Sequence, residues 1–261
     1  MARMYPLFSS SSGNCTYIGD ESSGILIDAG VSCKRICTAL NDRGIETSAV
    51  KAIFITHTHS DHIAGLKVLT KKLEVPVYSL RGNLEILARE DKVSPVSDLY
   101  EMNGSPVQAA GYEITAFDTP HDTPVSCGFR VTAPSGADCA VCTDLGHVTE
   151  DIHNELTKCR LVLLESNYDP KMLRTGPYPP DLKQRIASEH GHLSNHDCGA
   201  ELVKLVKAGV YSFVLGHISQ HNNTVQLAES SAVRALCEFE RGEDYLLTAA
   251  KPEGIGRAVI F

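Results

Sequence analysis

Short apolar runs and amphipathic segments alternate along the whole chain. Runs of this kind, rich in Val, Ile, Leu and aromatic residues, are typical of buried strands, whereas apolar residues at spacings of three and four predict helices. The expected strands are 5–8, 15–18, 25–28, 52–55, 75–80, 112–117, 125–132, 137–142, 161–165, 212–215, 245–248 and 258–261. The expected helices are 32–40, 63–73, 83–89, 197–208 and 225–238.

The order of these elements predicts an α/β protein. Strands and helices are mixed in two similar halves, a pattern that favours two sheets packed face to face with helices outside. No internal repeat, low-complexity tract or obvious linker interrupts the chain. We therefore expect one domain spanning 1–261, with ligand-binding loops at the strand ends.

Composition indicates a globular protein without a membrane segment. The 261 residues are 43% hydrophobic and 21% charged, and no run reaches the about 18 apolar residues that a membrane helix needs. The N-terminus becomes polar at Ser9 and lacks the apolar core of a signal peptide. The nine cysteines are scattered and odd in number, which favours reduced thiols. We expect a cytoplasmic protein that does not bind membranes.

The net charge of −8 excludes a protein-wide basic field that would recruit nucleic acid. The segment 171–185 departs from this balance, because it contains four basic residues and one acidic residue, a net +3. Two interpretations remain open for it. It is either a solvated surface segment or a local contact for a phosphate backbone.

The segment 56–62, Thr-His-Thr-His-Ser-Asp-His, directly follows the apolar run 52–55. His57, His59, Asp61 and His62 can all bind a transition metal, and imidazole with carboxylate suits zinc, manganese or iron. His57 and His59 point the same way in an extended chain. The alternative, a histidine-rich surface loop, is disfavoured because such a loop seldom follows a buried strand so directly.

Further candidate ligands follow other apolar runs. His121 comes after 114–120, Asp144 after 139–143, and His217 after 213–216. Each could alone be a loop or capping residue. Their repeated position at strand ends, together with the cluster at 57–62, favours a site that binds more than one metal ion.

These residues resemble the metallo-β-lactamase superfamily in type and order. The resemblance rests on Asp28 within 25–30, on the HxHxDH motif at 57–62, and on His121, Asp144 and His217. It implies a four-layer αββα sandwich. It further implies that His57, His59 and His121 hold one metal, that Asp61, His62 and His217 hold another, and that Asp144 bridges them. Asp28 would orient the histidine loop by accepting hydrogen bonds, although it could simply form a turn.

Two such ions sharing a water would lower its pKa toward about 7 and stabilise charge on the reacting group, so the bridging hydroxide is the expected nucleophile. Asp61 is a further candidate to accept its proton. The ligand types fit two divalent ions, Zn²⁺ or Mn²⁺ and also Fe²⁺, without deciding among them.

Several further residues are candidates for substrate contact. His192 is not needed as a ligand and could donate a proton to a leaving alkoxide, with Glu165 placed against it. A phosphate could be bound by Ser194, Asn195 and the helix start that follows, or by Ser12 and Asn14 in a serine-rich turn. The alternatives are a capping box around Ser194 and a plain loop around Ser12.

The chain also looks like the YycJ/WalJ branch of this superfamily, whose members resemble 5′-to-3′ DNA exonucleases. The matching strings lie at 11–15, 121–122 with 128–129, 165–167, 178–186, 191–195 and 217–223, the last including Asn222. The run 8–12 lacks a glycine common in that branch, and no arm of the tRNA-processing kind is present. The resemblance implies a phosphodiesterase acting on nucleic acid, with DNA favoured over RNA. Rival hypotheses are a thioester hydrolase of the glyoxalase II kind and a non-enzymatic signalling partner.

Overall fold

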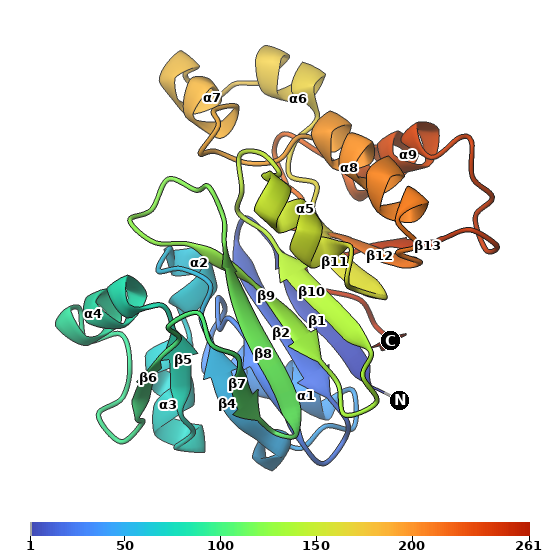
Figure 1. The fold of residues 1–261 in the computed structure, drawn as a ribbon. Coiled ribbons are helices and arrows are strands. Elements are labelled where there is room, and N and C mark those ends of the chain that lie inside the picture. Colours follow the sequence, from blue (N-terminus) through green and yellow to red (C-terminus); the bar gives the residue numbers. More distant parts are fainter. Residues whose placement is uncertain (1) are drawn as a thin grey trace.

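The computed structural model describes residues 2–261 and contains two seven-stranded mixed sheets that pack face to face (Figure 1). The first sheet has the order β14-β1-β2-β3-β4-β5-β6. Its strands are β1 (Arg3–Ser10), β2 (Gly13–Gly19), β3 (Gly24–Ile27), β4 (Val50–Phe54), β5 (Val77–Ser79), β6 (Leu99–Glu101) and β14 (Val259–Ile260). From β3 to β6 the neighbouring strands are parallel.

The second sheet has the order β13-β12-β11-β10-β9-β8-β7. Its strands are β7 (Val107–Ala109), β8 (Tyr112–Asp118), β9 (Cys127–Thr132), β10 (Asp138–Cys142), β11 (Leu161–Glu165), β12 (Ser212–Gly216) and β13 (Leu246–Ala249). Strands β10 to β13 are parallel. In both sheets the carboxyl ends of the parallel strands therefore lie at one edge, where loops can form a shared site.

The main core lies between the two sheets. Ile27 and Phe54 of the first sheet and Phe129 and Leu163 of the second belong to one buried cluster. The rings of Phe54 and Phe129 meet edge to face, with centroids 5.7 Å apart. Such a pair fixes the separation and register of two apolar sheet faces.

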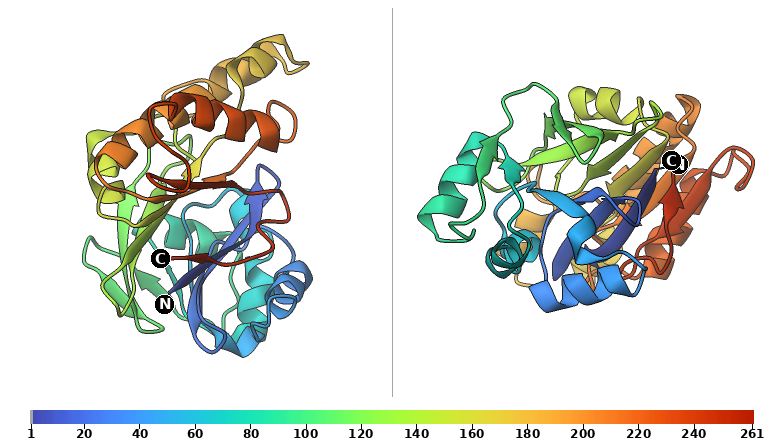
Figure 2. Two further views of the ribbon diagram at one scale, coloured as in Figure 1. Left: turned by 90° about the vertical axis from the view of Figure 1, so that its right-hand side faces the viewer. Right: turned by 90° about the horizontal axis from the view of Figure 1, so that it is seen from below.

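Helices cover both outer faces, so the molecule has four layers (Figure 2). The first sheet packs against α1 (Cys33–Asn41), α3 (Leu66–Leu73) and α4 (Arg81–Arg89) through a second buried cluster. The second sheet packs against α5 (Glu150–Leu156), α8 (Asn195–Lys207) and α9 (Val225–Ala235) through a third. The αββα architecture that the resemblance implied is confirmed. Within residues 2–261, no helix is long and apolar enough to cross a membrane.

The remaining helices are short: η1 (Thr47–Ala49), α2 (Ser60–Ile63), α6 (Pro170–Thr175) and α7 (Pro180–Ile186). The single helix expected over 63–73 is wrong, because the structure divides this region into α2 and α3 at Gly65. A Cβ atom at Gly65 would lie 1.9 Å from the carbonyl oxygen of Val31, so only glycine permits this close approach. α2 begins at Ser60, inside the histidine motif.

Candidate active site

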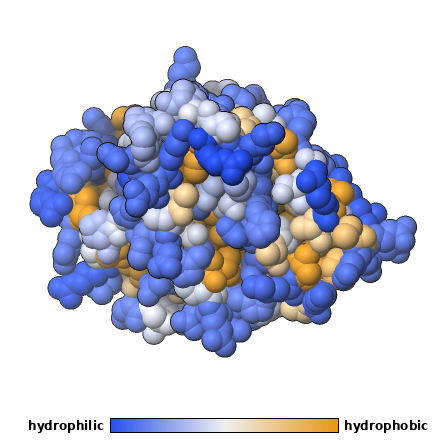
Figure 3. All heavy atoms as spheres, turned by 90° about the horizontal axis from the view of Figure 1, so that it is seen from above, coloured by the Kyte–Doolittle hydropathy of each residue, from blue (hydrophilic) through white to orange (hydrophobic). Residues whose placement is uncertain are grey.

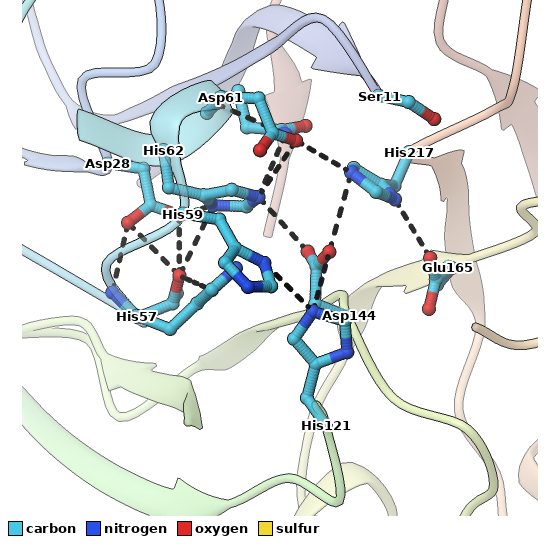
Figure 4. A network of polar contacts seen from close by, with 12 residues as sticks. Ser11, Asp28, His57, His59, Asp61, His62, His121, Asp144, Glu165 and His217 are labelled. Carbon is cyan, nitrogen blue, oxygen red and sulfur yellow. Dashed lines mark hydrogen bonds and ion pairs between the residues drawn. The ribbon is translucent and has the colours of Figure 1, made fainter. Parts of the chain in front are cut away.

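The histidine motif begins where β4 ends and continues into α2. His57 is fully buried, and α2 carries Asp61 and His62 in its single turn. Asp28, just after β3, accepts hydrogen bonds from the backbone nitrogen of Thr56 (2.9 Å) and from its hydroxyl. Nδ1 of His62 also lies 2.7 Å from the Asp28 carboxylate. Asp28 therefore fixes both the path of this loop and the ring of His62 (Figure 4).

His57, His59 and His121 form the first group of convergent ligands. One nitrogen from each lies within 4.8 Å of the others. His121 Nε2 is 3.2 Å from His59 Nδ1. The other nitrogen of His121, Nδ1, donates to the carbonyl of Gly191 at 3.0 Å, which orients Nε2 toward the site.

Asp61, His62 and His217 form the second group, again within 4.8 Å. Asp61 Oδ2 lies 3.4 Å from His217 Nε2 and 3.6 Å from His62 Nε2. His217 follows β12 in the other sheet, so this group joins the two halves of the sandwich across the cleft.

Asp144 lies between the two groups, as Figure 4 shows. Its Oδ1 is 3.7 Å from His121 Nε2 and 3.5 Å from His217 Nε2, whereas Oδ2 is 3.1 Å from His62 Nε2. One carboxylate thus faces ligands of both groups. The sequence predicted this juxtaposition of the seven side chains, and the structure brings all seven together.

Three residues of the site share an unusual backbone conformation. Asp28, Asp144 and His217 have φ angles of 60°, 60° and 52°. Residues other than glycine seldom adopt this left-handed conformation, and such strain collects at functional sites. Each residue comes just after a strand. Asp144 and His217 line the cleft, whereas Asp28 contacts His62 beside it.

Two buried polar atoms without hydrogen-bond partners indicate that these residues are suited to bind a metal ion. His57 Nε2 and Asp144 Oδ2 are buried, and neither has a hydrogen-bond partner among residues 2–261. Asp144 Oδ2 lies near His62 Nε2, but the angles at this contact are not those of a hydrogen bond. Buried polar atoms without partners are costly, and a cation would satisfy both. Imidazole and carboxylate donors, without a thiolate, fit divalent ions of the first transition row.

The electrostatics of the two groups differ. Burial lowers the pKa of His57, so its ring is neutral and able to bind a cation. Burial also acts against protonation of His217, but Asp144, Asp61 and Glu165 outweigh it and raise the pKa to about 10. Burial raises the pKa of Asp144, yet His217 and His62 hold it well below its usual range. The carboxylates therefore concentrate negative charge where a cation would bind.

Glu165 and His192 form the contact expected from the sequence. Glu165, at the end of β11, lies with Oε1 2.8 Å from His192 Nδ1. The same oxygen is 2.8 Å from Nδ1 of His217. His192 also lines the cleft, so its ring connects a buried carboxylate to the space beside the ligand groups.

The predicted substrate contacts lie in different environments. Ser12 is exposed at the cleft. Asn14 is buried, and its amide nitrogen lies 3.0 Å from His62 Nε2 and 3.4 Å from Asp61 Oδ2. Asn14 is therefore placed to orient the ligands, because its side chain does not reach the cleft.

Ser194 and Asn195 also make internal contacts. Ser194 caps α8 by accepting a hydrogen bond from the backbone of Asp197 at 3.1 Å, the alternative that the sequence left open. Asn195 accepts from Ser166 at 2.7 Å and donates to Asn223 at 3.0 Å. Both residues are buried, and these hydrogen bonds make them part of the structure that supports the cleft.

The cleft has a volume of about 390 Å³, within the range of small-ligand sites. The cleft is also lined by residues that the sequence did not assign to the site: Asp122, Tyr178, Leu182, Ile186 and Gln220. Arg185, from the segment considered as a phosphate contact, lines it as well. Most of these residues come from α7 and the turn before it. Arg185 forms an ion pair with Asp122, beside His121. The net positive charge of 171–185 was the available signal that this segment borders the site.

Comparison with known proteins extends these observations. A family profile described as the β-lactamase superfamily domain matches residues 24–218. Exodeoxyribonuclease YycJ of Bacillus anthracis is 30% identical over 252 residues, covering 95% of this chain and 94% of that protein. Exodeoxyribonuclease WalJ of Streptococcus pneumoniae serotype 2 is 31% identical over 240 residues, covering 90% of this chain and 88% of the relative.

A solved structure agrees in fold. Zn²⁺-bound PqqB from Methylobacterium extorquens has a TM-score of 0.75 with this chain, at 16% sequence identity and with complete coverage of both chains. At that identity the likeness supports the arrangement of the layers only.

Proposed function

Because this chain belongs to the β-lactamase superfamily, we propose that it is a metal-dependent phosphodiesterase that degrades nucleic acid, specifically DNA from the 5′ end. The observation that carries the proposal is the position of Asp144, whose carboxylate faces both ligand groups in one cleft. A pair of cation sites joined by a carboxylate is the arrangement used for phosphodiester hydrolysis. Named exodeoxyribonucleases of nearly the same length supply the substrate class.

We assign the first ion to His57, His59 and His121, and the second to Asp61, His62 and His217, with Asp144 shared. Two divalent ions, Zn²⁺ or Mn²⁺ and also Fe²⁺, suit these donors. When bound, such ions lower the pKa of water toward neutrality and neutralise charge that develops on a phosphoryl group.

The protein's own residues then have distinct tasks. Asp28 orients His62 and the loop through hydrogen bonds, and the side-chain amide of Asn14 donates a hydrogen bond to Asp61. Glu165 holds His192 through Nδ1, which leaves Nε2 to donate a proton to the leaving oxygen. Asp61, at the edge of the ligand groups and partly exposed, is the residue placed to accept the proton released by water.

Substrate binding falls to the exposed rim of the cleft. Ser12 offers its hydroxyl to a phosphate, while its backbone N–H donates to Ser10 Oγ at 3.2 Å. Arg185 and Lys183 of α7 lie on the segment with net positive charge and supply attraction that the whole protein, at −8, does not. We therefore expect weak binding that weakens further as salt concentration rises.

The test uses metal-stripped protein with Mn²⁺ or Zn²⁺ added back. Oligonucleotides of DNA and RNA, labelled at the 5′ or 3′ end and single- or double-stranded, form the substrate panel. We expect stepwise release of nucleotides from the 5′ end of DNA. Failure to degrade any oligonucleotide, with wild type as inert as His57→Ala, would contradict the nuclease proposal.

The same metal-reconstituted protein also tests the rival hypothesis, thioester hydrolysis. Turnover of S-lactoylglutathione without nucleolysis would place the protein among thioester hydrolases. His196→Ala, a change of an exposed histidine on α8, is the matched control for His57→Ala and should retain full activity.

A further inference from the structure

An aromatic pair lies at the outer part of the cleft. Tyr178, in the turn between α6 and α7, and His221, in the loop after β12, have ring centroids 5.9 Å apart with planes tilted by 51°. Both residues line the same cleft as His59 and His192. Neither belongs to the ligand groups, and the roles assigned above do not use them.

Apolar side chains adjoin this pair. Leu182 and Ile186 of α7 are half-buried and also line the cleft. No residue of α7 is fully buried, so packing alone does not fix this helix. The ion pair between Arg185 and Asp122 attaches α7 beside the first ligand group, since Asp122 Oδ1 lies 3.4 Å from His121 Nε2. The apolar contacts thus stay next to the reaction site.

Asn222 supplies a polar group at the same place. The residue is 1% exposed, and its side-chain oxygen Oδ1 has no hydrogen-bond partner among the described residues, although Asn222 lines the cleft. The nearby Gly176 keeps this space open, because a Cβ atom there would lie 3.2 Å from Oδ1. A buried amide oxygen without a donor is a costly feature that a ligand N–H would satisfy.

We propose that Tyr178, His221 and Asn222 form a subsite for one unpaired nucleobase of the substrate strand. Stacking on an aromatic ring binds any base, because every base has a π face. The amide oxygen of Asn222 would accept one of the N–H groups that a base uses in Watson–Crick pairing. A base within a duplex cannot make that contact, so the subsite selects a single-stranded or frayed end. This inference rests on the proposed function.

The surface around the subsite is consistent with such a local contact. Seen from above, the side on which α6 and α7 lie in Figure 1, the molecule is mostly hydrophilic with small separate apolar areas (Figure 3). Backbone phosphates would meet this hydrophilic surface, while a base would enter the aromatic part of the cleft.

The test compares two single-stranded DNA oligonucleotides. One has normal bases throughout, and the other has abasic tetrahydrofuran residues at both ends. We expect Tyr178→Ala to lower kcat/KM on the first about 10-fold, within the roughly 5- to 150-fold range that one stacked base contributes, and to leave the second unchanged. Tyr178→Phe, which keeps the ring, should behave as wild type. Tyr100→Ala, an exposed tyrosine on β6, is the matched control.

Binding gives a second measurement that does not need turnover. Phosphorothioate oligonucleotides carrying terminal 2-aminopurine resist hydrolysis, and stacking quenches their fluorescence. Wild type and Tyr178→Phe should quench the signal, and Tyr178→Ala should not. Equal quenching by Tyr178→Ala, or equal loss of activity on both oligonucleotides, would overturn the subsite. Absence of all cleavage by wild type would instead contradict the proposed function.

Discussion

The buried carboxylate of Glu165 contacts the ring of His192, with Oε1 2.8 Å from Nδ1. Burial raises the pKa of Glu165, but His192 and His217 bring it down to about 2. The carboxylate is therefore ionised at neutral pH and accepts from both rings. Burial lowers the pKa of His192, but Glu165 outweighs this effect and raises it, which favours the form with a proton on both nitrogens. Nδ1 then donates to Glu165, and Nε2 keeps a proton to donate.

We predict that His192→Ala lowers kcat by about 10²- to 10⁴-fold, the usual contribution of a general acid. Metal content should stay at the wild-type value. A nucleotide p-nitrophenyl ester, whose leaving group needs no proton, should lose much less activity. Steady-state kinetics on both substrates and elemental analysis of the purified protein check these outcomes.

His196→Ala serves again as the control. The opposing result is loss of bound metal from His192→Ala, because His192 also lies within 4.8 Å of Asp144, Glu165 and His217. That result would make His192 a ligand, and its effect on kcat would then follow from the missing ion.

Asp28→Asn should weaken metal binding by about 10- to 100-fold, the usual cost of removing a partner that orients a ligand. Asparagine tolerates the left-handed backbone of Asp28, so the turn itself is kept. Its amide cannot accept from both Thr56 and His62 as the carboxylate does. Competition with a chelator measures the change, and a lowered melting temperature with unaltered metal affinity would contradict the assignment.

The convergence of the candidate ligands could be predicted because they come at or shortly after the ends of strands. Asp28 and His217 come immediately after β3 and β12, Asp144 comes two residues after β10, and the parallel strands of both sheets end at one edge. The short sequences at the strand ends are therefore enough to predict that these side chains lie close together. The four-layer fold followed for the same reason, since the alternation of apolar runs and amphipathic helices determines which faces are buried.

The roles of the residues proposed to contact the substrate could not be predicted, because they depend on contacts between segments that are far apart in the sequence. Asn14 meets Asp61 across 47 positions, and Asn195 meets Ser166 across 29. No pattern in the sequence distinguishes an asparagine that faces a cleft from one buried under it. The helices α6 and α7 were missed as well, since they are short, α6 buries only Leu173 and α7 buries no residue.

Stability should depend on pH through Glu155 of α5, which pairs with Arg130 and Lys158. Burial raises the pKa of Glu155, but these two cations lower it below its ordinary value of 4.5. Its contribution is therefore present above that value and is lost as pH falls through the lower, folded-state pKa. We expect Glu155→Gln to lower the melting temperature at pH 7 by about 1–2 °C.

Melting curves from pH 3 to 7 check this prediction. The difference from wild type should shrink toward zero at the acidic end. Glu243→Gln, a change of an exposed glutamate, should show no such trend. A difference that stays constant over the whole range would mean that packing rather than charge is responsible.

Metal removal should lower the melting temperature at neutral pH. An ion at 100 times its Kd stabilises the folded state by about 2.7 kcal/mol, which corresponds to roughly 5–10 °C for a chain of this size. Chelation followed by addition of Mn²⁺ or Zn²⁺ should therefore produce a reversible shift in calorimetry. His57→Ala, which removes the ligand whose buried Nε2 has no other partner among residues 2–261, should shift much less. An identical response of wild type and His57→Ala would show that the stabilising ion binds elsewhere, because this ligand group would then contribute nothing to its affinity.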